Sequence, residues 1–330
     1  MSEPIRTGVL GVGSLGRYHA QKYAGHAGAE LVGVFDPDME RAEAVAAETG
    51  SVAFPDAGSL VEGVDAVTIA APTDVHGDLG VKALNAGVDV LMEKPLAASL
   101  SEADDLIAAA DAAGRVLQVG HLMRFHPGVR RLADSGMDRR PPRYLEANRL
   151  NTFQPRSLDI DVILDLMVHD LDLILHWVGS PVAEVRAIGI PVVTDKVDMA
   201  NARIAFDSGA VANLTASRVA RKQVREVRMF QPHRYVSLDF VDSAMGVYEL
   251  DDSAGDGPVP GARGEQLELG AADLLAEEVD AFLQACAGVS SDGVGAREGR
   301  AALGLGLDVR AAIDDHFASY GADSLKVDGP

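Results

Sequence analysis

The feature that most constrains this chain is a glycine-rich turn near its N-terminus. Residues 5–19 read IRTGVLGVGSLGRYH, in which a short apolar strand leads through Gly11, Gly13 and Gly16 into a helix. In a G-x-G-x-x-G turn the first glycine permits a tight bend and the second lets a pyrophosphate approach the backbone. The third lets the helix pack closely on the strand. The segment therefore predicts a phosphate-binding turn at the edge of a parallel sheet.

An acidic residue at the end of the following strand extends this pattern to a whole cofactor. The strand LVGVFD ends in Asp36, about twenty residues after the last glycine, where a carboxylate can accept a hydrogen bond from an adenosine ribose 2′-hydroxyl. With the phosphates near Ser14 and Leu15 at the helix N-terminus, the pattern predicts a bound dinucleotide. The carboxylate favours NAD over NADP.

Length and charge limit what else the chain can be. Its 330 residues exceed one typical domain, so we expect an NAD-binding domain over residues 1–122 and a substrate-binding and oligomerisation domain over 123–330. Whether the C-terminal helix packs back on the first domain stays open. With 29 basic and 50 acidic residues, the net charge of −21 disfavours nucleic acid and membrane surfaces as partners. A phosphorylated ligand must then be held by local arginines and helix N-termini.

The single cysteine and the N-terminal segment bear on the cellular compartment. Cys286 excludes an intramolecular disulfide and a cysteine-based zinc cluster, and its helical context predicts a small buried residue. The first residues lack the basic and hydrophobic parts of a signal peptide, and no run of about 18 apolar residues occurs. We therefore expect a cytoplasmic protein.

The first 120 residues alternate between apolar strand patterns and amphipathic helices. The helices are expected over 39–48, 75–86 and 99–113, between six short strands. This order predicts an α/β fold with a doubly wound parallel sheet and right-handed crossovers. Ligands of such sheets lie beyond the carboxyl ends of the strands, so the loops there are the first candidate site. Besides the glycine turn, they contain Ala71, Pro72, Thr73, His76, Glu93, Lys94 and Pro95.

The second half has a different pattern. Residues 160–178 predict a strongly apolar helix, and strand patterns alternate from 200 to 250 with hairpin connections at 207–209 and 231–233. These favour an α+β domain with an open, mostly antiparallel sheet, one face covering the helix and the other meeting solvent or a partner subunit. We expect a loop over 251–265 and two final helices, over 271–287 and 297–318.

Three ionisable residues are candidates for catalysis. Lys94 follows a strand directly and precedes Pro95, so it can reach a ligand, although a solvated lysine is equally consistent. Asp165 and His169 lie four residues apart in the apolar helix and project from one face. A carboxylate that orients an imidazole prepares a general base, and a pair satisfied within the core is the alternative.

The neighbouring polar residues of this helix have other expected roles. Asp161, Asp170 and Asp172 are expected to face solvent or to cap the helix. A metal site would need further ligands; His121, His126 and His176 are available, but no spacing specifies them, and we expect no metal.

Several arginines could offset the acidic surface by binding phosphate. A planar guanidinium suits bidentate phosphate recognition, although a single arginine is more often an ion-pair partner. The candidates for substrate binding, together with Asp165 and His169, are Arg124, Arg156 and Arg218, with Arg149 beside them.

In combination, these motifs resemble the Gfo/Idh/MocA oxidoreductases. GVGSLGRYH, APT at 71–73 with His76, EKP at 93–95 and the helix with Asp165 and His169 together carry the resemblance across nearly the whole chain. It implies a Rossmann domain, a second domain with an open sheet that forms homodimers or homotetramers, and a proline of EKP that is commonly cis. It also implies that Lys94, Asp165 and His169 surround the nicotinamide and the reacting carbinol.

Segments such as VGHLMRFHP at 119–127 and FQPHRYVSLDF at 230–240 are similar to one branch of this family, the UDP-N-acetylglucosamine 3-dehydrogenases of lipid A biosynthesis. That likeness implies NAD-dependent oxidation of the C3 hydroxyl of a nucleotide sugar to a ketone, which a PLP-dependent aminotransferase then converts. Lys94 would stabilise the alkoxide and His169 accept the proton, or the reverse. A dehydrogenase of a free polyol or hexose and a non-catalytic NAD-binding sensor are the alternatives.

Overall fold

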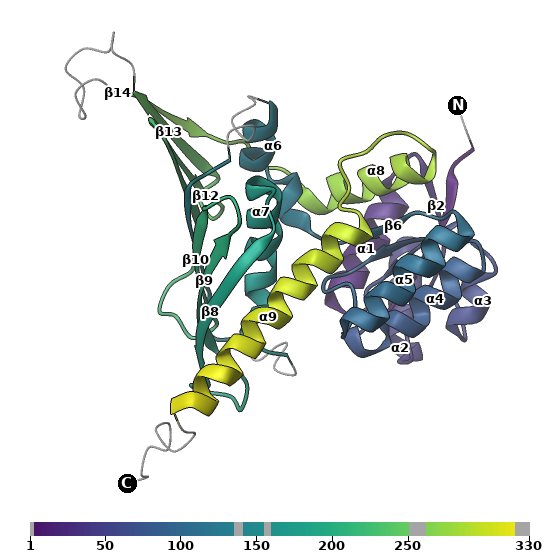
Figure 1. Ribbon diagram of the computed structural model, residues 1–330. Helices are drawn as coiled ribbons and strands as arrows, with labels where there is room; N and C mark the ends of the chain where they lie inside the picture. The colour runs from purple at the N-terminus through teal and green to yellow at the C-terminus, as the bar shows by residue number, and fades with distance from the viewer. Residues whose placement is uncertain (1–2, 135–140, 155–159, 251–261, 321–330) are drawn as a thin grey trace. The chain divides into compact units, whose positions relative to one another are not determined.

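The computed structural model describes residues 3–134, 141–154, 160–250 and 262–320 (Figure 1). They form two compact units. The first contains Met1–Phe125 and Asp273–Leu303, and the second contains His126–Ala272 and Gly304–Pro330. The expected division at residue 122 differs from this one because residues 273–303 belong to the first unit.

The first unit is built on a six-stranded parallel sheet in the order β3-β2-β1-β4-β5-β6. This confirms the predicted doubly wound Rossmann architecture, since the order reverses between β1 and β4. The strands are β1 (Ile5–Leu10), β2 (Ala29–Phe35), β3 (Val52–Ala53), β4 (Ala66–Ile69), β5 (Asp89–Met92) and β6 (Leu117–Val119). The helices between them are α1 (Ser14–Gly25), α2 (Met39–Thr49), α3 (Ala57–Val61), α4 (His76–Asn85) and α5 (Leu100–Ala113).

Helix boundaries in this unit follow from local capping. The Asp38 side chain accepts a hydrogen bond from the backbone of Arg41 at the start of α2, and Ser99 does the same for Glu102 at the start of α5. Both helices end at a glycine in the left-handed conformation. The sequence therefore fixes these boundaries locally, and the predicted helices match the observed ones to within a few residues.

Helix α8 (Leu274–Cys286) belongs to the first unit although it follows the second in sequence. Its buried residues Val279, Phe282 and Leu283 join the cluster formed by Val9 and Tyr23. An amphipathic helix with this apolar face is stabilised by the core that it covers. Burial of this face explains why the chain returns to the Rossmann unit after residue 272.

The second unit contains an eight-stranded sheet in the order β14-β13-β12-β11-β7-β10-β9-β8. All neighbouring strands are antiparallel except β7 and β10, which confirms the predicted mostly antiparallel sheet. The strands are β7 (Tyr144–Leu150), β8 (Val182–Ile190), β9 (Met199–Phe206), β10 (Val211–Ser217), β11 (Val224–Gln231), β12 (Arg234–Asp239), β13 (Ala244–Leu250) and β14 (Ala262–Glu268). Strand β14 replaces part of the loop expected over 251–265, whose residues 251–261 lie outside the described ones.

One face of this sheet is covered by helices (Figure 1). A π-helical turn, η4 (Ile163–Met167), continues into α7 (Val168–Val178), and α9 (Ala296–Tyr320) adds its C-terminal part to the same unit. The short helix α6 (Pro127–Asp134) opens the unit. On β7, Leu145 and Ala147 are buried in alternation with half-buried residues, as expected for a sheet with one covered face.

The opposite side of the sheet carries a row of aromatic rings. Tyr144, Phe230, Tyr235 and Tyr248 come from four adjacent strands, and their successive ring centroids lie 5.5, 4.9 and 5.9 Å apart. Cross-strand aromatic pairs stabilise a sheet. Among the described residues, no helix has the length and apolar character needed to span a membrane.

Candidate active site

The structure brings together the three loops predicted to border the cofactor. Gly11 takes φ +86°, a conformation that favours glycine, and its N–H donates to the carbonyl of Phe35 at 2.8 Å. A Cβ added to Gly11 would lie 2.8 Å from the backbone of Ala71, and one added to Gly16 would overlap the carbonyl oxygen of Gly11. These glycines therefore allow the β1–α1 turn to lie directly against the chain after β4.

The second glycine of the turn has a different environment. Gly13 is the N-cap residue of α1, and apart from its neighbours in the chain no described residue lies within 4 Å of a Cβ placed there. Ser14 and Leu15 beside it are exposed. A helix N-terminus with free space at its cap fits the phosphates of a dinucleotide, because first-turn N–H groups and the helix dipole both favour an anion.

Asp36 lies at the end of β2, as the cofactor prediction requires, and it is buried. One carboxylate oxygen accepts the N–H of Val12 at 2.9 Å, and the other accepts the N–H of Asp38 at 2.9 Å. The half-exposed guanidinium of Arg41 lies 3.2 Å from this carboxylate. Asp36 is therefore held in place by the glycine turn itself.

His76 joins the remaining two loops. Its imidazole is buried, with Nε2 2.9 Å from the carbonyl oxygen of Ala71 and Nδ1 2.9 Å from that of Pro95. Burial lowers the pKa of His76 below its ordinary value. His76 therefore joins the loop at 71–73 to the loop at 93–95. The sequence pattern did not reveal this structural role.

Lys94 lies next to a buried pair of ionisable side chains. Glu93 and His19 are both buried, with Oε1 2.9 Å from Nε2, and Glu93 Oε2 accepts the backbone N–H of Lys94 at 3.2 Å. Burial alone would raise the pKa of Glu93, but the hydrogen bond and charge of His19, aided by Lys94, bring that pKa below its ordinary value. Lys94 itself is half-buried, and the peptide bond to Pro95 is cis, as the resemblance implied.

The second unit carries the other two catalytic candidates. Asp165 and His169 are half-buried, whereas Ile163, Leu164 and Met167 around them are buried. Asp165 lies in the π-helical turn and His169 in the first turn of α7, so the segment is not the uniform α-helix that was predicted. Such π-turns occur frequently at functional sites.

The aspartates near this pair correct one expectation. Asp161 caps the helix as expected, because its Oδ1 accepts the N–H groups of Ile163 and Leu164 at 3.0 Å. Asp170 and Asp172 are buried instead of facing solvent. Arg149 on β7 holds Asp170 through two hydrogen bonds, of 2.9 and 2.7 Å. Arg149 is thus engaged with a carboxylate, and sequence spacing could not reveal this pairing because the two residues are 21 positions apart.

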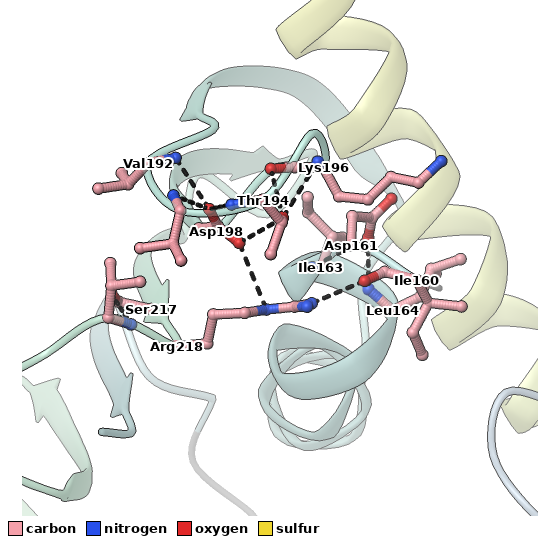
Figure 2. Close-up of polar contacts among 12 residues, drawn as sticks. Ile160, Asp161, Ile163, Leu164, Val192, Thr194, Lys196, Asp198, Ser217 and Arg218 are labelled. Carbon is pink, nitrogen blue, oxygen red and sulfur yellow. Dashed lines mark hydrogen bonds and ion pairs between the residues drawn. The ribbon is translucent and has the colours of Figure 1, made fainter. Parts of the chain in front are cut away.

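The three arginines expected to bind substrate have different surroundings. Arg124 is mostly buried in the first unit and pairs with Glu298 at 3.3 Å. Arg156 lies outside the described residues. Arg218 is buried in the second unit, where it donates to the carbonyl of Ile160 at 2.7 Å and faces Asp198 at 3.9 Å (Figure 2). In the part of the chain that the structure describes, no group of three or more His, Cys, Asp or Glu side chains could hold a metal ion.

With this geometry in place, the chain can be compared with known proteins. Residues 5–121 match a family described as "Oxidoreductase family, NAD-binding Rossmann fold", and residues 131–231 match "GFO/IDH/MocA C-terminal domain". The chain belongs to the Gfo/Idh/MocA family. This confirms the family resemblance seen in the motifs and makes the protein an oxidoreductase with an NAD-binding domain.

Two members of the family are similar over different lengths. UDP-N-acetylglucosamine 3-dehydrogenase of Acidithiobacillus ferrooxidans is 48% identical over 314 residues, which cover 94% of this chain and 97% of the relative. A scyllo-inositol 2-dehydrogenase (NAD(+)) of Bacillus subtilis is 34% identical over 236 residues, or 67% of this chain and 69% of the relative. A structure of the A. ferrooxidans enzyme has a TM-score of 0.90 at 46% identity and covers 96% of this chain and 99% of that one.

Proposed function

We propose that this protein oxidises the C3 hydroxyl of UDP-N-acetylglucosamine to a ketone, with NAD as the oxidant. The observation that carries the proposal is the 48% identity to a UDP-N-acetylglucosamine 3-dehydrogenase over 94% of this chain and 97% of the relative. The inositol dehydrogenase match is weaker and covers only 67% of the chain. The similarity to this relative extends over both domains. It therefore includes the substrate domain, where specificity for a sugar nucleotide must lie.

The cofactor part of the proposal depends on the first unit. The N-terminus of α1 and the space at Gly13 suit the pyrophosphate, and Asp36 suits a ribose 2′-hydroxyl. We assign NAD instead of NADP because the Asp36 carboxylate already holds the neighbouring Arg41, which could otherwise bind a 2′-phosphate. When bound, NAD supplies the acceptor for the hydride that leaves C3.

For the chemical step we assign one role to each of three residues. Lys94 hydrogen-bonds the C3 oxygen and stabilises the negative charge that develops there. His169 accepts the hydroxyl proton on its imidazole, and Asp165 orients and charge-balances that imidazole. The proton therefore moves to His169 as the hydride leaves the same carbinol, and the C3 oxygen becomes a carbonyl.

The opposite assignment, with Lys94 as the base, is distinguished by Lys94→Arg. Arginine keeps a positive hydrogen-bond donor but does not accept a proton at accessible pH. A Lys94→Arg enzyme that retains measurable turnover, combined with a His169→Asn enzyme that does not, supports His169 as the base. The reverse pattern of activities makes Lys94 the base.

The proposal also includes the surroundings of the reaction. Arg124 and Arg156 are assigned to the substrate phosphates, and the ketone product is a substrate for a PLP-dependent aminotransferase. The enzyme acts as a homodimer or homotetramer in the cytoplasm, where nucleotide sugars and NAD are found.

The decisive experiment measures NADH formation with three substrates and NAD. We expect turnover with UDP-N-acetylglucosamine and little with free N-acetylglucosamine or myo-inositol. UDP alone should raise the melting temperature, because a ligand that binds only the folded state stabilises it. If myo-inositol is the only one of the three substrates that is oxidised, the protein is a polyol dehydrogenase. If NAD binds but none of the three is oxidised, the protein is a sensor.

A further inference from the structure

The segment that leads into the catalytic helix is held by a network of polar contacts in the second unit (Figure 2). Asp161 caps the helix start, and the N–H of Val162 donates to the carbonyl of Val197 at 3.0 Å. The N–H of Asp165 donates to the carbonyl of Asp161 at 3.0 Å. The position of Asp165 is therefore tied through one turn of backbone to residues 160–162.

Arg218 connects this segment to the sheet. It directly follows β10, a central strand that pairs with β7 and β9. Its side chain donates to the carbonyl of Ile160 at 2.7 Å, and its backbone N–H donates to the carbonyl of Asp198 at 2.9 Å. The side chain is 6% exposed, so the contact with Ile160 lies in the protein interior, where water competes weakly.

Asp198 supplies the charge that balances Arg218. Its side chain is fully buried, and its Oδ2 accepts the N–H groups of Val192, Val193 and Thr194 at 2.7 to 2.8 Å. Oδ1 accepts the Thr194 hydroxyl at 2.7 Å and faces Arg218 at 3.9 Å. Burial raises the pKa of Asp198, but these hydrogen bonds outweigh it and bring the pKa to about 2. The loop from 192 to 198 is thus organised around one carboxylate, and Arg218 joins it to the helix start.

We propose that Arg218 is a positioning residue: it sets the start of the helix that carries Asp165 and His169, in place of binding the substrate phosphate. This inference rests on the proposed function for the roles of Asp165 and His169. The far side of the pair has its own attachment, because Arg149 holds Asp170. Loss of Arg218 therefore leaves α7 attached to the sheet but releases the π-helical turn that contains Asp165.

The kinetic test compares Arg218→Ala with Arg203→Ala. Arg203 lies on the neighbouring strand β9 and is exposed, and its guanidinium donates to Asn213 at 3.2 Å, so it is a matched control. We expect kcat of Arg218→Ala to fall about tenfold to a hundredfold, since a misplacement of about 1 Å can cost that much. The KM for UDP-N-acetylglucosamine and the affinity for UDP should stay within about twofold, and guanidinium ion should restore part of kcat.

Two outcomes would overturn the inference. A normal kcat in Arg218→Ala would show that Arg218 does not position the catalytic pair. A normal kcat with a raised KM and weaker UDP binding would show that Arg218 binds the substrate phosphates. If Arg218→Ala does not fold, Arg218→Lys carries the comparison. Lysine keeps the charge but has one nitrogen, which cannot replace both guanidinium contacts.

A second measurement does not depend on the substrate. The imidazole resonance of His169, assigned by its loss in His169→Gln, is titrated by NMR in the wild type and in both arginine variants. We expect the midpoint to move in Arg218→Ala and to stay in Arg203→Ala. An unchanged midpoint in both contradicts positioning, whereas a moved midpoint in a protein that fails to oxidise UDP-N-acetylglucosamine keeps the positioning and rejects the proposed function.

Discussion

The glycine turn of the first unit and the helix that carries Asp165 and His169 in the second are held by different means. The shape of the turn depends on its own glycines: Gly11 takes a positive φ, and Gly16 leaves room for the carbonyl of Gly11. All of these residues lie within one short stretch of sequence. Such a turn is disrupted when a side chain is added to one of these glycines.

The helix of the second unit depends on partners that are distant in sequence. Arg218 holds Ile160 across 58 positions, and Arg149 holds Asp170 across 21. Removing the partner of such a buried charged side chain is strongly destabilising. The comparison teaches that the glycine turn of the first unit is encoded locally, whereas the position of the helix in the second unit depends on the whole sheet.

The largest effect is expected at Lys94, which we assign to the reacting oxygen. Lys94→Ala should lower kcat by about a hundredfold to a thousandfold, the range for loss of one hydrogen-bond donor to a developing oxyanion, and leave NADH binding nearly unchanged. NADH formation and NADH fluorescence measure the two quantities. Lys82→Ala on the exposed face of α4 is the control. A Lys94→Ala enzyme with a normal rate would remove Lys94 from the mechanism.

The next effect tests the dependence of the second unit on distant partners. Arg149→Met leaves the buried Asp170 without its guanidinium, which should lower the free energy of unfolding by about 3–5 kcal/mol in urea titrations. Adding Asp170→Asn should recover part of this loss, because the uncompensated charge is removed. Arg186→Met, which breaks the exposed pair with Glu184, should cost about 1 kcal/mol or less. Equal losses in the two single variants would contradict the distinction between buried and exposed pairs.

The same distinction explains how far the sequence could be interpreted. The Rossmann strands, the three loops and the glycine turn were predictable, because their signals are short-range spacings. Strand β7 was not predicted, because its inward side includes Arg149 and the apolar alternation is therefore broken. Strand β14, ARGEQLE, has no apolar pattern and is defined by its pairing with β13.

What the sequence did not reveal around the candidate site has the same origin. Asp170 was expected to face solvent, since a lone aspartate in an apolar helix gives no sign of a partner 21 positions earlier. The contacts of Arg218 with Ile160 and Asp198 could not be foreseen either, since these residues meet only in the folded sheet. Candidate catalytic residues can be named from the sequence, whereas the contacts that hold them are visible only in the fold.

A smaller effect separates two glycines within the nucleotide-binding turn. Gly16→Ala places a methyl against the carbonyl of Gly11 and should cost about 1–3 kcal/mol of stability. Gly13→Ala meets no described atom within 4 Å, so its melting temperature should stay at the wild-type value while its affinity for NAD falls. Thermal melts and NAD titrations measure both. Unchanged NAD affinity in Gly13→Ala would place the pyrophosphate elsewhere.

The last comparison concerns one buried carboxyl group in each unit. Asp198 of the second unit accepts four hydrogen bonds and has a pKa of about 2, so its contribution to stability is lost only as pH falls through that value. Glu278 on α8 of the first unit is also buried, but no described residue donates to either of its oxygens. Burial, with the charge of Glu93, raises the pKa of Glu278 well above its ordinary value of 4.5.

The smallest effect is expected for Glu278, because among the described residues no hydrogen bond joins its carboxyl group to a candidate catalytic residue. Its contribution to stability is complete below pH 4.5 and declines as pH rises through the raised pKa, since the folded protein then loses a proton that it binds more tightly than the unfolded chain. Glu278→Gln stays neutral, so its stability relative to the wild type should grow as pH increases while kcat is unchanged. Urea titrations over a pH series measure the difference, with Glu43→Gln on the exposed face of α2 as the control. A constant difference between the Glu278→Gln and wild-type proteins over that series would mean that the pKa of Glu278 is the same in the folded and unfolded states. The lack of hydrogen-bond donors around Glu278 would then not distinguish it from Asp198.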